Sequence, residues 1–300
     1  MNANRANRRE ASVSATPTAT RGGAAAKGLA ERSAPQVGPA PIVTLLTDFG
    51  ERDGFVGIVK GILLGICPTV RIIDLSHDVS AQDVTSAALV LSSAVDHFPP
   101  GTVHLAVVDP GVGTARRPIL IETDRFALVG PDNGLLSLAA ARATVQKVIH
   151  LDRPEHFRSS PSQTFHARDV FAPVAARRAA GMPASDLGSE IDAFERLDLP
   201  QPRRLDDAIE GQVIHIDRFG NLICNIARGG HDGFLERGVS ISINGVQIPE
   251  ISPHYSAVRE GKPLALWNSW DRLEIAIRNG SAARHLRARV GDRVQVKLRR

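Results

Sequence analysis

The sequence has 300 residues, with 43% hydrophobic and 4% aromatic residues, so a sizeable core built mainly from aliphatic side chains is expected. Its formal charge of +4 arises in the first forty residues, which carry six basic and two acidic residues; the remainder is balanced. A neutral body with few aromatics lacks the footprint of a nucleic-acid-binding protein, and no apolar run reaches the roughly 18 residues of a transmembrane helix.

Residues 1–40 are predicted to be a disordered tail, because Ala, Arg, Ser, Thr and Pro dominate and large apolar side chains are scarce. The composition resembles an organelle transit peptide, although a dispensable tail is the favoured interpretation, and no secretory apolar segment is present. Cys67 and Cys224 each lie in an apolar stretch outside any CxxC pair. We expect two buried, reduced thiols in a cytoplasmic protein.

Residues 41–200 are predicted to form an α/β domain in which strands and helices alternate. The order of strand, helix, strand, helix and strand predicts a mostly parallel sheet with flanking helices on both faces. The first helix places Ile58, Val59, Ile62, Leu63 and Ile66 on one face, and the second is expected to be capped near Ser80. The expected elements are strands at 41–50, 70–78, 102–110, 117–123 and 125–134, and helices at 53–66, 82–97 and, after His166, up to Gly181.

A change of pattern follows residue 200, where "PQPRRLDD" is predicted to be a linker. Residues 208–300 then form a smaller, mostly β domain. Two strands flank a turn at 219–221, and Asn244-Gly245 marks the bend of a hairpin. "LEIAI" and "DRVQVKL" add further strands near the end of the chain.

Acidic residues follow three of the predicted strands. Asp48, Asp74 (with His77 nearby) and Asp109 come at the ends of apolar runs. In an open α/β sheet, ligands bind beyond the carboxyl ends of the strands, so these acids are candidates for a binding site. One or two of them could instead cap the helix that follows.

The segment "VDPGVGTARRP" at 108–118 contains two glycines, as phosphate-binding loops do. It lacks the third glycine of a dinucleotide-binding loop and the Gly-Lys-Ser/Thr of the P-loop that binds nucleoside triphosphates. No GxSxG serine-hydrolase motif and no HExxH zinc motif occurs. The scattered histidines His77, His104, His150 and His166 could be metal ligands only if the fold assembles them in space.

What remains is a set of single polar residues suited to holding one small molecule: an acid, a permanent cation and a titratable base. For each, a structural role is the alternative: a turn cap, a surface charge or a helix cap. The members are Asp48, Asp109, Arg116, His166, Asp217 and Asn221.

Six short motifs occur in an order that resembles one family. They are "TDFG" (47–50), "DPGVGT" (109–114), "PDNG" (131–134), "TFHARD" (164–169), "FGN" (219–221) and "RNGSAA" (278–283). Together they are similar to the adenosine-forming S-adenosyl-L-methionine hydrolases, also called SAM hydroxide adenosyltransferases, which are relatives of the fluorinases and chlorinases. The resemblance spans about residues 42–298 and leaves out the tail.

The resemblance implies a reaction and an assembly. Water or hydroxide attacks C5′ of the ribose, methionine leaves and adenosine is released. A homotrimer with active sites at subunit interfaces is implied, with no metal or organic cofactor, no nucleic acid and no membrane. The catalytic triad of the family corresponds to Asp109, Arg116 and His166. Arg116 would polarise the water, Asp109 would orient Arg116 or the water, and His166 would complete the hydrogen bonds or take the proton.

The resemblance also implies a set of substrate contacts. Asp48 would accept both ribose hydroxyls, Asn221 with Phe219 would contact adenine, and the backbone at Asn279-Gly280 would pair with the adenine edge. Asp217 and Ser269 would bind the amino-acid end of the substrate.

Phe165 could pack on the substrate; for Phe165 and Phe219, packing in the core is the alternative. Trp270 and Asp271 stand where the family varies, so contacts to the methionine part near them are left open.

Two other functions compete with hydrolysis. A halogenase would use the same substrate with chloride or fluoride as nucleophile, but the charge of Asp109 would repel a halide. A protein that binds S-adenosylmethionine or a nucleoside without turnover is the other alternative, against which the complete set of Asp109, Arg116 and His166 argues.

Overall fold

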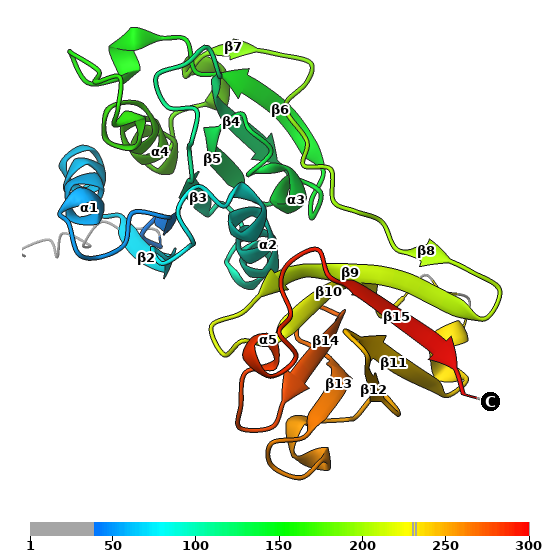
Figure 1. Cartoon of the computed structure of the whole chain (residues 1–300). Coiled ribbons are helices and arrows are strands. Elements are labelled where there is room, and N and C mark those ends of the chain that lie inside the picture. Colours follow the sequence, from blue (N-terminus) through cyan, green and yellow to red (C-terminus); the bar gives the residue numbers. More distant parts are fainter. Residues whose placement is uncertain (1–38, 230, 232, 300) are drawn as a thin grey trace, which may run out of the picture. The chain divides into compact units, whose positions relative to one another are not determined.

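The structure is a computed structural model that describes residues 39–229, 231 and 233–299. The predicted tail at 1–40 therefore lies outside the described residues, apart from its last two positions. The chain from residue 39 onward is one compact unit that contains two sheets (Figure 1). None of the described helices is long and apolar enough to cross a bilayer.

The first sheet has seven strands in the order β2-β1-β3-β5-β4-β6-β7. The first four in that order pair in parallel, and the others pair antiparallel. The α/β class is confirmed, with a mixed sheet. β4 and β5 are joined by residues 124–126, a connection too short for the crossover that parallel pairing needs. The strands are β1 (Ile42–Thr47), β2 (Arg71–Ser76), β3 (Val103–Val107), β4 (Pro118–Thr123), β5 (Ala127–Pro131), β6 (Val145–His150) and β7 (Ser189–Glu190).

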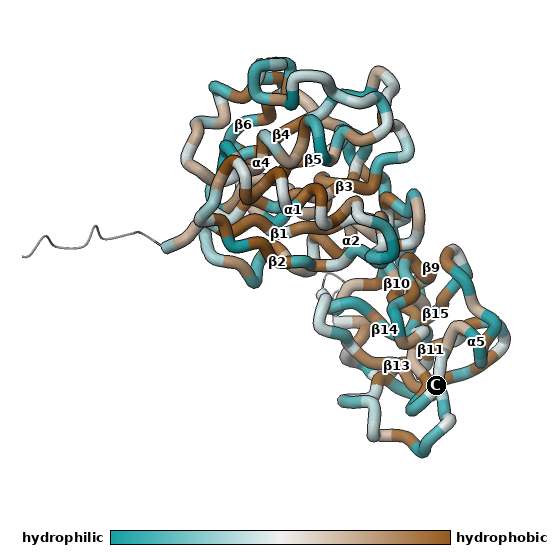
Figure 2. The backbone as a smooth tube through the Cα atoms, turned by 90° about the vertical axis from the view of Figure 1, so that its left-hand side faces the viewer, coloured by the Kyte–Doolittle hydropathy of each residue, from teal (hydrophilic) through white to brown (hydrophobic). Residues whose placement is uncertain are grey.

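Helices cover both faces of this sheet, and each face has its own core. Leu45 and Leu105 point to α1 (Phe55–Ile66) and α4 (Ala172–Ala179). Their neighbours Leu46 and Ala106 point to α2 (Val84–Ala94) and α3 (Ser137–Ala140). Because both faces are buried, the central strands read as continuous apolar runs, which Figure 2 shows in brown for β1 and β3.

Two details of the helices differ from expectation. The N-cap of α2 is Asp83, which accepts a hydrogen bond from the Ser86 amide at 2.9 Å, so the predicted cap at Ser80 is wrong. In α1 the chain buries Val56, Val59 and Leu63 and leaves Ile58 45% exposed. Part of the predicted apolar face of α1 therefore lies on the surface of the chain.

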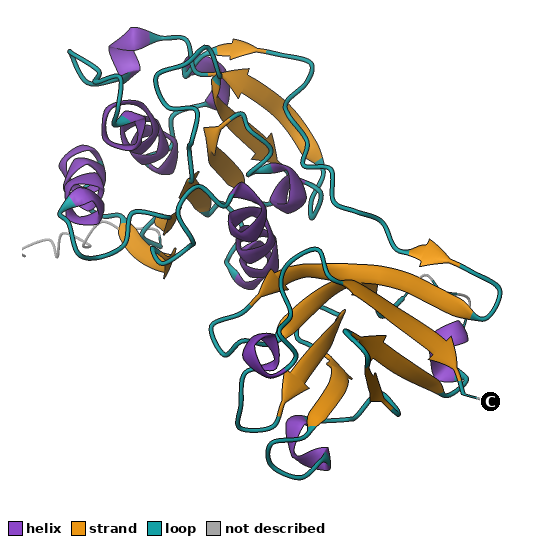
Figure 3. Cartoon of the chain, viewed as in Figure 1, coloured by secondary structure: helices purple, strands orange, loops and turns teal. Residues whose placement is uncertain are grey.

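The C-terminal part of the chain consists mostly of β-strands, as predicted, and these strands form the second sheet (Figure 3). Its main path is β12-β11-β15-β9-β10-β14-β13, and a bridge between Ile251 and Ala265 brings its two ends together. Asn244 and Gly245 both adopt positive φ at the hairpin bend, as the Asn-Gly signal predicted. The strands are β8 (Arg203–Arg204), β9 (Ala208–Ile216), β10 (Leu222–Ala227), β11 (Val239–Ile243), β12 (Val246–Ile248), β13 (Pro263–Trp267), β14 (Arg272–Ile277) and β15 (Arg293–Leu298).

The predicted linker at 200–207 contains the short strand β8, which pairs with β9. Contacts join the two sheets beyond this connection. Leu89 of α2 packs with Ile214 and Ile223, and Nδ1 of His215 lies 3.1 Å from the Ser86 hydroxyl. The division into domains at 41–200 and 208–300 stays a prediction.

Candidate active site

The carboxyl ends of β1 and β3 bring two of the predicted acids to one cavity. These strands pair in parallel with Thr47 opposite Val107, so the residues that follow them emerge at the same edge of the sheet. Asp48 and Asp109 line a cavity of about 230 Å³ there, together with Phe165 and His166. The third acid, Asp74, does not line this cavity and pairs with Lys60 at 2.6 Å.

Arg116 joins the acid and the histidine of the predicted triad. Its Nε donates to Oδ1 of Asp109 at 2.9 Å, and its Nη2 donates to Oδ2 of the same carboxylate. The same Nη2 lies 3.0 Å from Nδ1 of His166. The guanidinium also stacks over the buried ring of Phe171, 5.1 Å from the centroid. The Arg116 side chain is 9% exposed, so one charged carboxylate and one ring hold it rigidly in a largely dry site.

The contact with Arg116 fixes the protonation state of His166. A guanidinium N–H can only donate, so Nδ1 of His166 accepts and the ring proton resides on Nε2. Burial and the neighbouring Arg116 cation both lower the pKa of His166. At neutral pH the imidazole is therefore neutral, and the nitrogen facing Arg116 has no capacity for a further proton.

One nitrogen of the guanidinium remains without a protein partner. Nη1 of Arg116 is buried and makes no hydrogen bond to any residue that the structure describes. A buried unpaired donor is costly, and a charged one more so. Nη1 is thus the atom of this site best suited to hold an oxygen of a small ligand.

Glycines permit the loop of 109–116 to close. Gly113 has φ +77°, and a Cβ there would overlap the backbone carbonyl oxygen of Gln163. Gly111 faces the Arg116 side chain, with a Cβ position 3.3 Å from Cγ. The loop therefore lies directly against the segment before His166, which brings Arg116 to the histidine. A phosphate is not needed to explain these glycines.

Asp48 and Phe165 form other walls of this cavity. Oδ2 of Asp48 accepts a hydrogen bond from the amide of Gln82 at 2.8 Å, and Gln82, also in the wall, has a positive φ of 65°. Such strained backbone gathers at functional sites, a signal that the sequence does not carry. Phe165 lines the cavity and packs edge-on against Phe49 and Phe55, so both of its predicted roles are compatible with its position.

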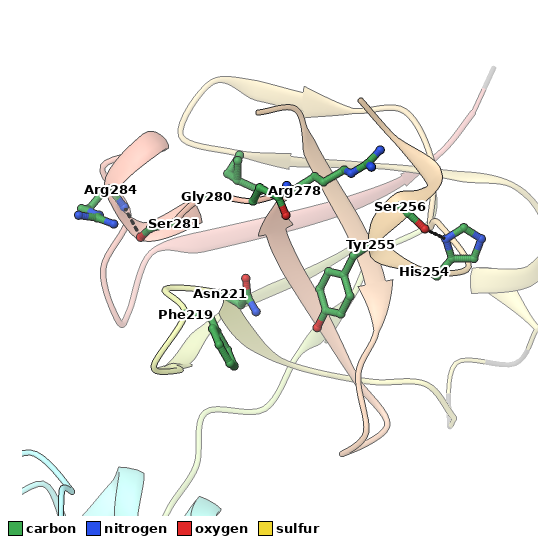
Figure 4. A pocket seen from close by; sticks show the side chains of 11 residues that line it. Phe219, Asn221, His254, Tyr255, Ser256, Arg278, Gly280, Ser281 and Arg284 are labelled. Carbon is green, nitrogen blue, oxygen red and sulfur yellow. Dashed lines mark hydrogen bonds between the residues drawn. The ribbon is translucent and has the colours of Figure 1, made fainter. Parts of the chain in front are cut away.

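The remaining predicted residues line different cavities, in the second sheet. Phe219, Asn221, Asn279 and Gly280 line one of about 810 Å³ (Figure 4). Phe219 is 76% exposed, so the alternative that it packs in the core is wrong. Gly220 beside it has φ +84°, and a Cβ there would overlap Ser281. The "FGN" turn therefore rests on the "RNGSAA" segment, which assembles one wall from both motifs.

Asp217 and Ser269 line an adjoining cavity of about 470 Å³. Asp217 also builds the turn: Oδ1 accepts from the amides of Phe219 and Asn221, and Oδ2 accepts from the Asn221 side chain at 3.0 Å. Trp270 lines this cavity too, and its ring lies 5.6 Å from that of His215.

Tyr255 and Glu274 are among the residues of these cavities that sequence reasoning missed. Tyr255 lines both cavities, the larger of which Figure 4 shows, and its hydroxyl donates to Oε1 of Glu274 at 2.6 Å. Glu274 lies on β14, almost fully buried, and burial raises its pKa. A charged residue in the apolar run "LEIAI" is the signal that could have found it.

Several other residues noted in the sequence have contacts that give them structural roles. His104 is buried with Nδ1 2.8 Å from the Thr44 hydroxyl, and burial lowers its pKa to about 4. Cys67 and Cys224 are buried and unpaired, as predicted. Arg117, to which no role was assigned, pairs with the buried Asp132. Within the described residues, no group of three or more His, Cys, Asp or Glu side chains is arranged to hold a metal ion.

Comparison with known proteins supports the sequence resemblance. Residues 43–188 match the SAM hydroxide adenosyltransferase N-terminal domain, and residues 211–295 match the C-terminal domain of the same family. An (R)-S-adenosyl-L-methionine hydrolase from Salinispora tropica is 39% identical, covering 86% of this chain and 98% of that protein. A fluorinase from Nocardia brasiliensis is 29% identical over a match that covers 87% of this chain and 98% of the fluorinase.

A solved structure has the same fold. It is the crystal structure of an uncharacterised conserved protein from Thermotoga maritima, with a TM-score of 0.79 and 34% identity, covering 85% of this chain and 99% of that one. Both domain matches, the identity to the hydrolases and the shared fold agree. The chain belongs to the SAM hydroxide adenosyltransferase family.

Proposed function

We propose that the protein hydrolyses S-adenosyl-L-methionine to adenosine and L-methionine by attack of water or hydroxide at C5′ of the ribose. The observation that carries this proposal is the buried Nη1 of Arg116, a cationic donor without a protein partner. Hydrolases 39% identical to this chain carry the corresponding name.

The chemistry needs an activated nucleophile more than an acid. The substrate carries a sulfonium, and the leaving thioether is neutral, so departure needs no proton. Water is a poor nucleophile and must lie in line with the C–S bond. A cation at Nη1 of Arg116 favours the hydroxide form of a bound water, whose proton passes to solvent, and fixes its position.

The triad then divides its work around Arg116. Asp109 holds Nε and Nη2 of Arg116, and His166 accepts from Nη2. Both contacts orient the guanidinium and leave Nη1 for the nucleophile. Because Nδ1 of His166 is already an acceptor, we assign His166 an orienting role in this arrangement rather than that of general base.

The substrate contacts follow the predicted assignment. Asp48 binds the ribose hydroxyls, and Phe165 closes the cavity beside them. Phe219, Asn221 and the backbone at Asn279-Gly280 bind adenine. Asp217 and Ser269 bind the amino-acid end. Exposure of Phe219 supports its part, since a large apolar ring left at a cavity wall is suited to stacking on a purine.

We further infer a homotrimer whose active sites lie between subunits. Asp109 and His166 line one cavity and the adenine-side residues of the same chain line another, so one substrate needs both groups from neighbouring copies. Three large apolar side chains of α1, Phe55, Ile58 and Leu64, are exposed and add support, because exposed apolar surface marks protein interfaces.

Complementation tests the shared site. Asp109→Ala and Asn221→Ala variants are each expected to be inactive or nearly so. After the two are unfolded together and refolded, random trimers should regain about a quarter of the wild-type activity, since each site then draws one intact side from each variant. Absence of any recovery in verified mixed trimers would place all contacts in one chain.

The cytoplasm is the proposed location, in keeping with two buried, unpaired cysteines. No cofactor is proposed, because neither departure of a thioether nor attack by an Arg-bound hydroxide requires one.

The direct test of function is incubation of the purified protein with S-adenosylmethionine, with and without chloride. Chromatography should show adenosine and methionine in equal amounts in both. A 5′-halogenated nucleoside would instead support a fluorinase-like or chlorinase-like activity, and substrate bound but unconsumed would support a binding protein.

A further inference from the structure

We propose that Asp169 is a positioning residue that holds the two catalytic loops against each other. It lies three residues after His166, in a π-helical turn at Ala167–Phe171, and its side chain is fully buried. Wide turns of this kind are frequent at functional sites. Asp169 does not line the cavity of the triad, so it acts through the backbone around it.

The carboxylate of Asp169 gathers donors from two neighbouring segments. Oδ2 accepts from the backbone amide of Ser162 at 2.8 Å. Arg168 donates from Nε to Oδ1 at 2.7 Å and from Nη2 to Oδ2 at 2.8 Å. Burial opposes the charge, but the hydrogen bonds from Arg168 and Ser162 lower the pKa of Asp169. The group is therefore an ionised carboxylate at neutral pH.

A second tie fixes the start of the same segment. The amide of Arg158 donates to the backbone carbonyl of Asp169 at 3.0 Å. Residues 158–162 are thus attached to Asp169 at both ends of that stretch. Arg168, which pairs with the carboxylate, also lies over the ring of Phe165, 5.2 Å from its centroid, so one buried acid orders both the segment and a wall of the cavity.

The tied segment backs directly onto the loop that carries Arg116. Gln163 follows Ser162, and its carbonyl oxygen occupies the space where Gly113 has no side chain. The chain of contacts runs from Asp169 through Ser162 and Gln163 to Gly113. It ends at the 3.0 Å approach of Arg116 to His166. Loss of the Asp169 carboxylate frees this segment to move away and loosens that approach.

Asp169→Asn tests the role, with Glu122→Gln as the matched control. Glu122 also accepts two hydrogen bonds from one arginine, Arg178, at 2.9 and 2.5 Å, but joins α4 to β4. The inference rests on the proposed hydrolysis for its kinetic readout. We expect kcat to fall about 10- to 100-fold in Asp169→Asn with KM changed far less, since a small misplacement of a catalytic group has this effect. Glu122→Gln should keep kcat.

Hydrogen exchange supplies a readout independent of activity. The Ser162 amide and its neighbours at 158–166 should exchange faster in Asp169→Asn than in Glu122→Gln at matched thermal stability. Asp169→Glu, which restores the charge on a longer side chain, should recover part of kcat. Equal kcat in the two amide variants, or unchanged exchange at 158–166, would overturn the proposal. If the wild-type protein showed no turnover, the proposed hydrolase function would be wrong. The exchange measurement would still test the role of Asp169.

Discussion

Nη2 of Arg116 lies 3.0 Å from Nδ1 of His166, and because the guanidinium can only donate, this contact makes the histidine a neutral acceptor. In the proposed mechanism, the catalytic centre is thereby a pre-oriented cation with one unpaired nitrogen, Nη1, rather than an acid–base pair.

The pH dependence of turnover should carry the signature of His166. Its pKa lies below the usual 6.5 because of burial and the Arg116 cation. Protonation at low pH removes the acceptor that holds Nη2, so kcat should be constant above pH 6.5 and fall on the acid side. In His166→Gln, whose amide can accept but does not titrate, this acid limb should disappear from a kcat profile between pH 4.5 and 8. The same limb in the variant would assign the titration to another group.

Arg116 and Arg117 offer an internal comparison, since both pair with a buried aspartate. Lysine lacks the fork that reaches Asp109, His166 and a nucleophile together. Arg116→Lys should lower kcat by about 100- to 1,000-fold, with a smaller change in KM. Arg117→Lys keeps its point charge beside Asp132 and should retain kcat within about 3-fold. Steady-state kinetics of the two variants tests this prediction. Similar losses of kcat in both would show that Arg116 has no catalytic role beyond that of Arg117.

Gly113 should tolerate alanine far less than a glycine of similar backbone geometry. Gly113 and Gly101 have φ of +77° and +85°, but a Cβ at Gly101 meets nothing within 4 Å. Gly101→Ala therefore measures the cost of positive φ alone, about 1 kcal/mol of unfolding free energy. Gly113→Ala must also displace Gln163, so it should lower kcat as well as stability. Denaturant unfolding and kcat for both variants check this, and full kcat in Gly113→Ala would show that the loop contact is dispensable.

The buried His104 should make folding stability depend on pH. Its pKa is about 6.5 unfolded and about 4 folded, so the unfolded state binds the proton first as pH falls. The contribution of His104 is complete above pH 6.5 and is lost progressively down to pH 4. At pH 4.5 the free energy of unfolding that has been lost through His104 amounts to about 2 to 3 kcal/mol. His104→Asn, which cannot titrate, should lose correspondingly less free energy of unfolding between pH 7 and 4.5. An identical loss would place the effect elsewhere.

Local signals predicted much of the fold. The apolar runs of β1 and β3 and the Asn244-Gly245 bend depend on neighbours in sequence, and the structure confirms them. β6 was missed because half of its residues are exposed and polar ones interrupt the run. The cap of α2 was misplaced because Ser80 and Asp83 are both good capping residues, and hydrogen bonding to Ser86 decides between them.

The sequence predicted which residues belong to the candidate site, but not how the fold distributes them over separate cavities. Motif order pointed to Asp109, Arg116 and His166, which the fold brings together. That Asp109 and His166 line a different cavity from Phe219 and Asn221 depends on tertiary structure. The hydrogen bond from Tyr255 to the buried Glu274 joins a short helical turn to a strand residue nineteen positions away, a contact that local patterns do not specify.

The origin of the oxygen atom in the product tests the central claim most directly. A reaction of the purified protein with S-adenosylmethionine in ¹⁸O-labelled water, followed by mass spectrometry of the nucleoside, should place one labelled oxygen at the 5′ position of adenosine and none in methionine. Arg116→Lys should slow the appearance of that label. Adenosine without ¹⁸O, or label in methionine, would contradict attack by an Arg116-bound water at C5′.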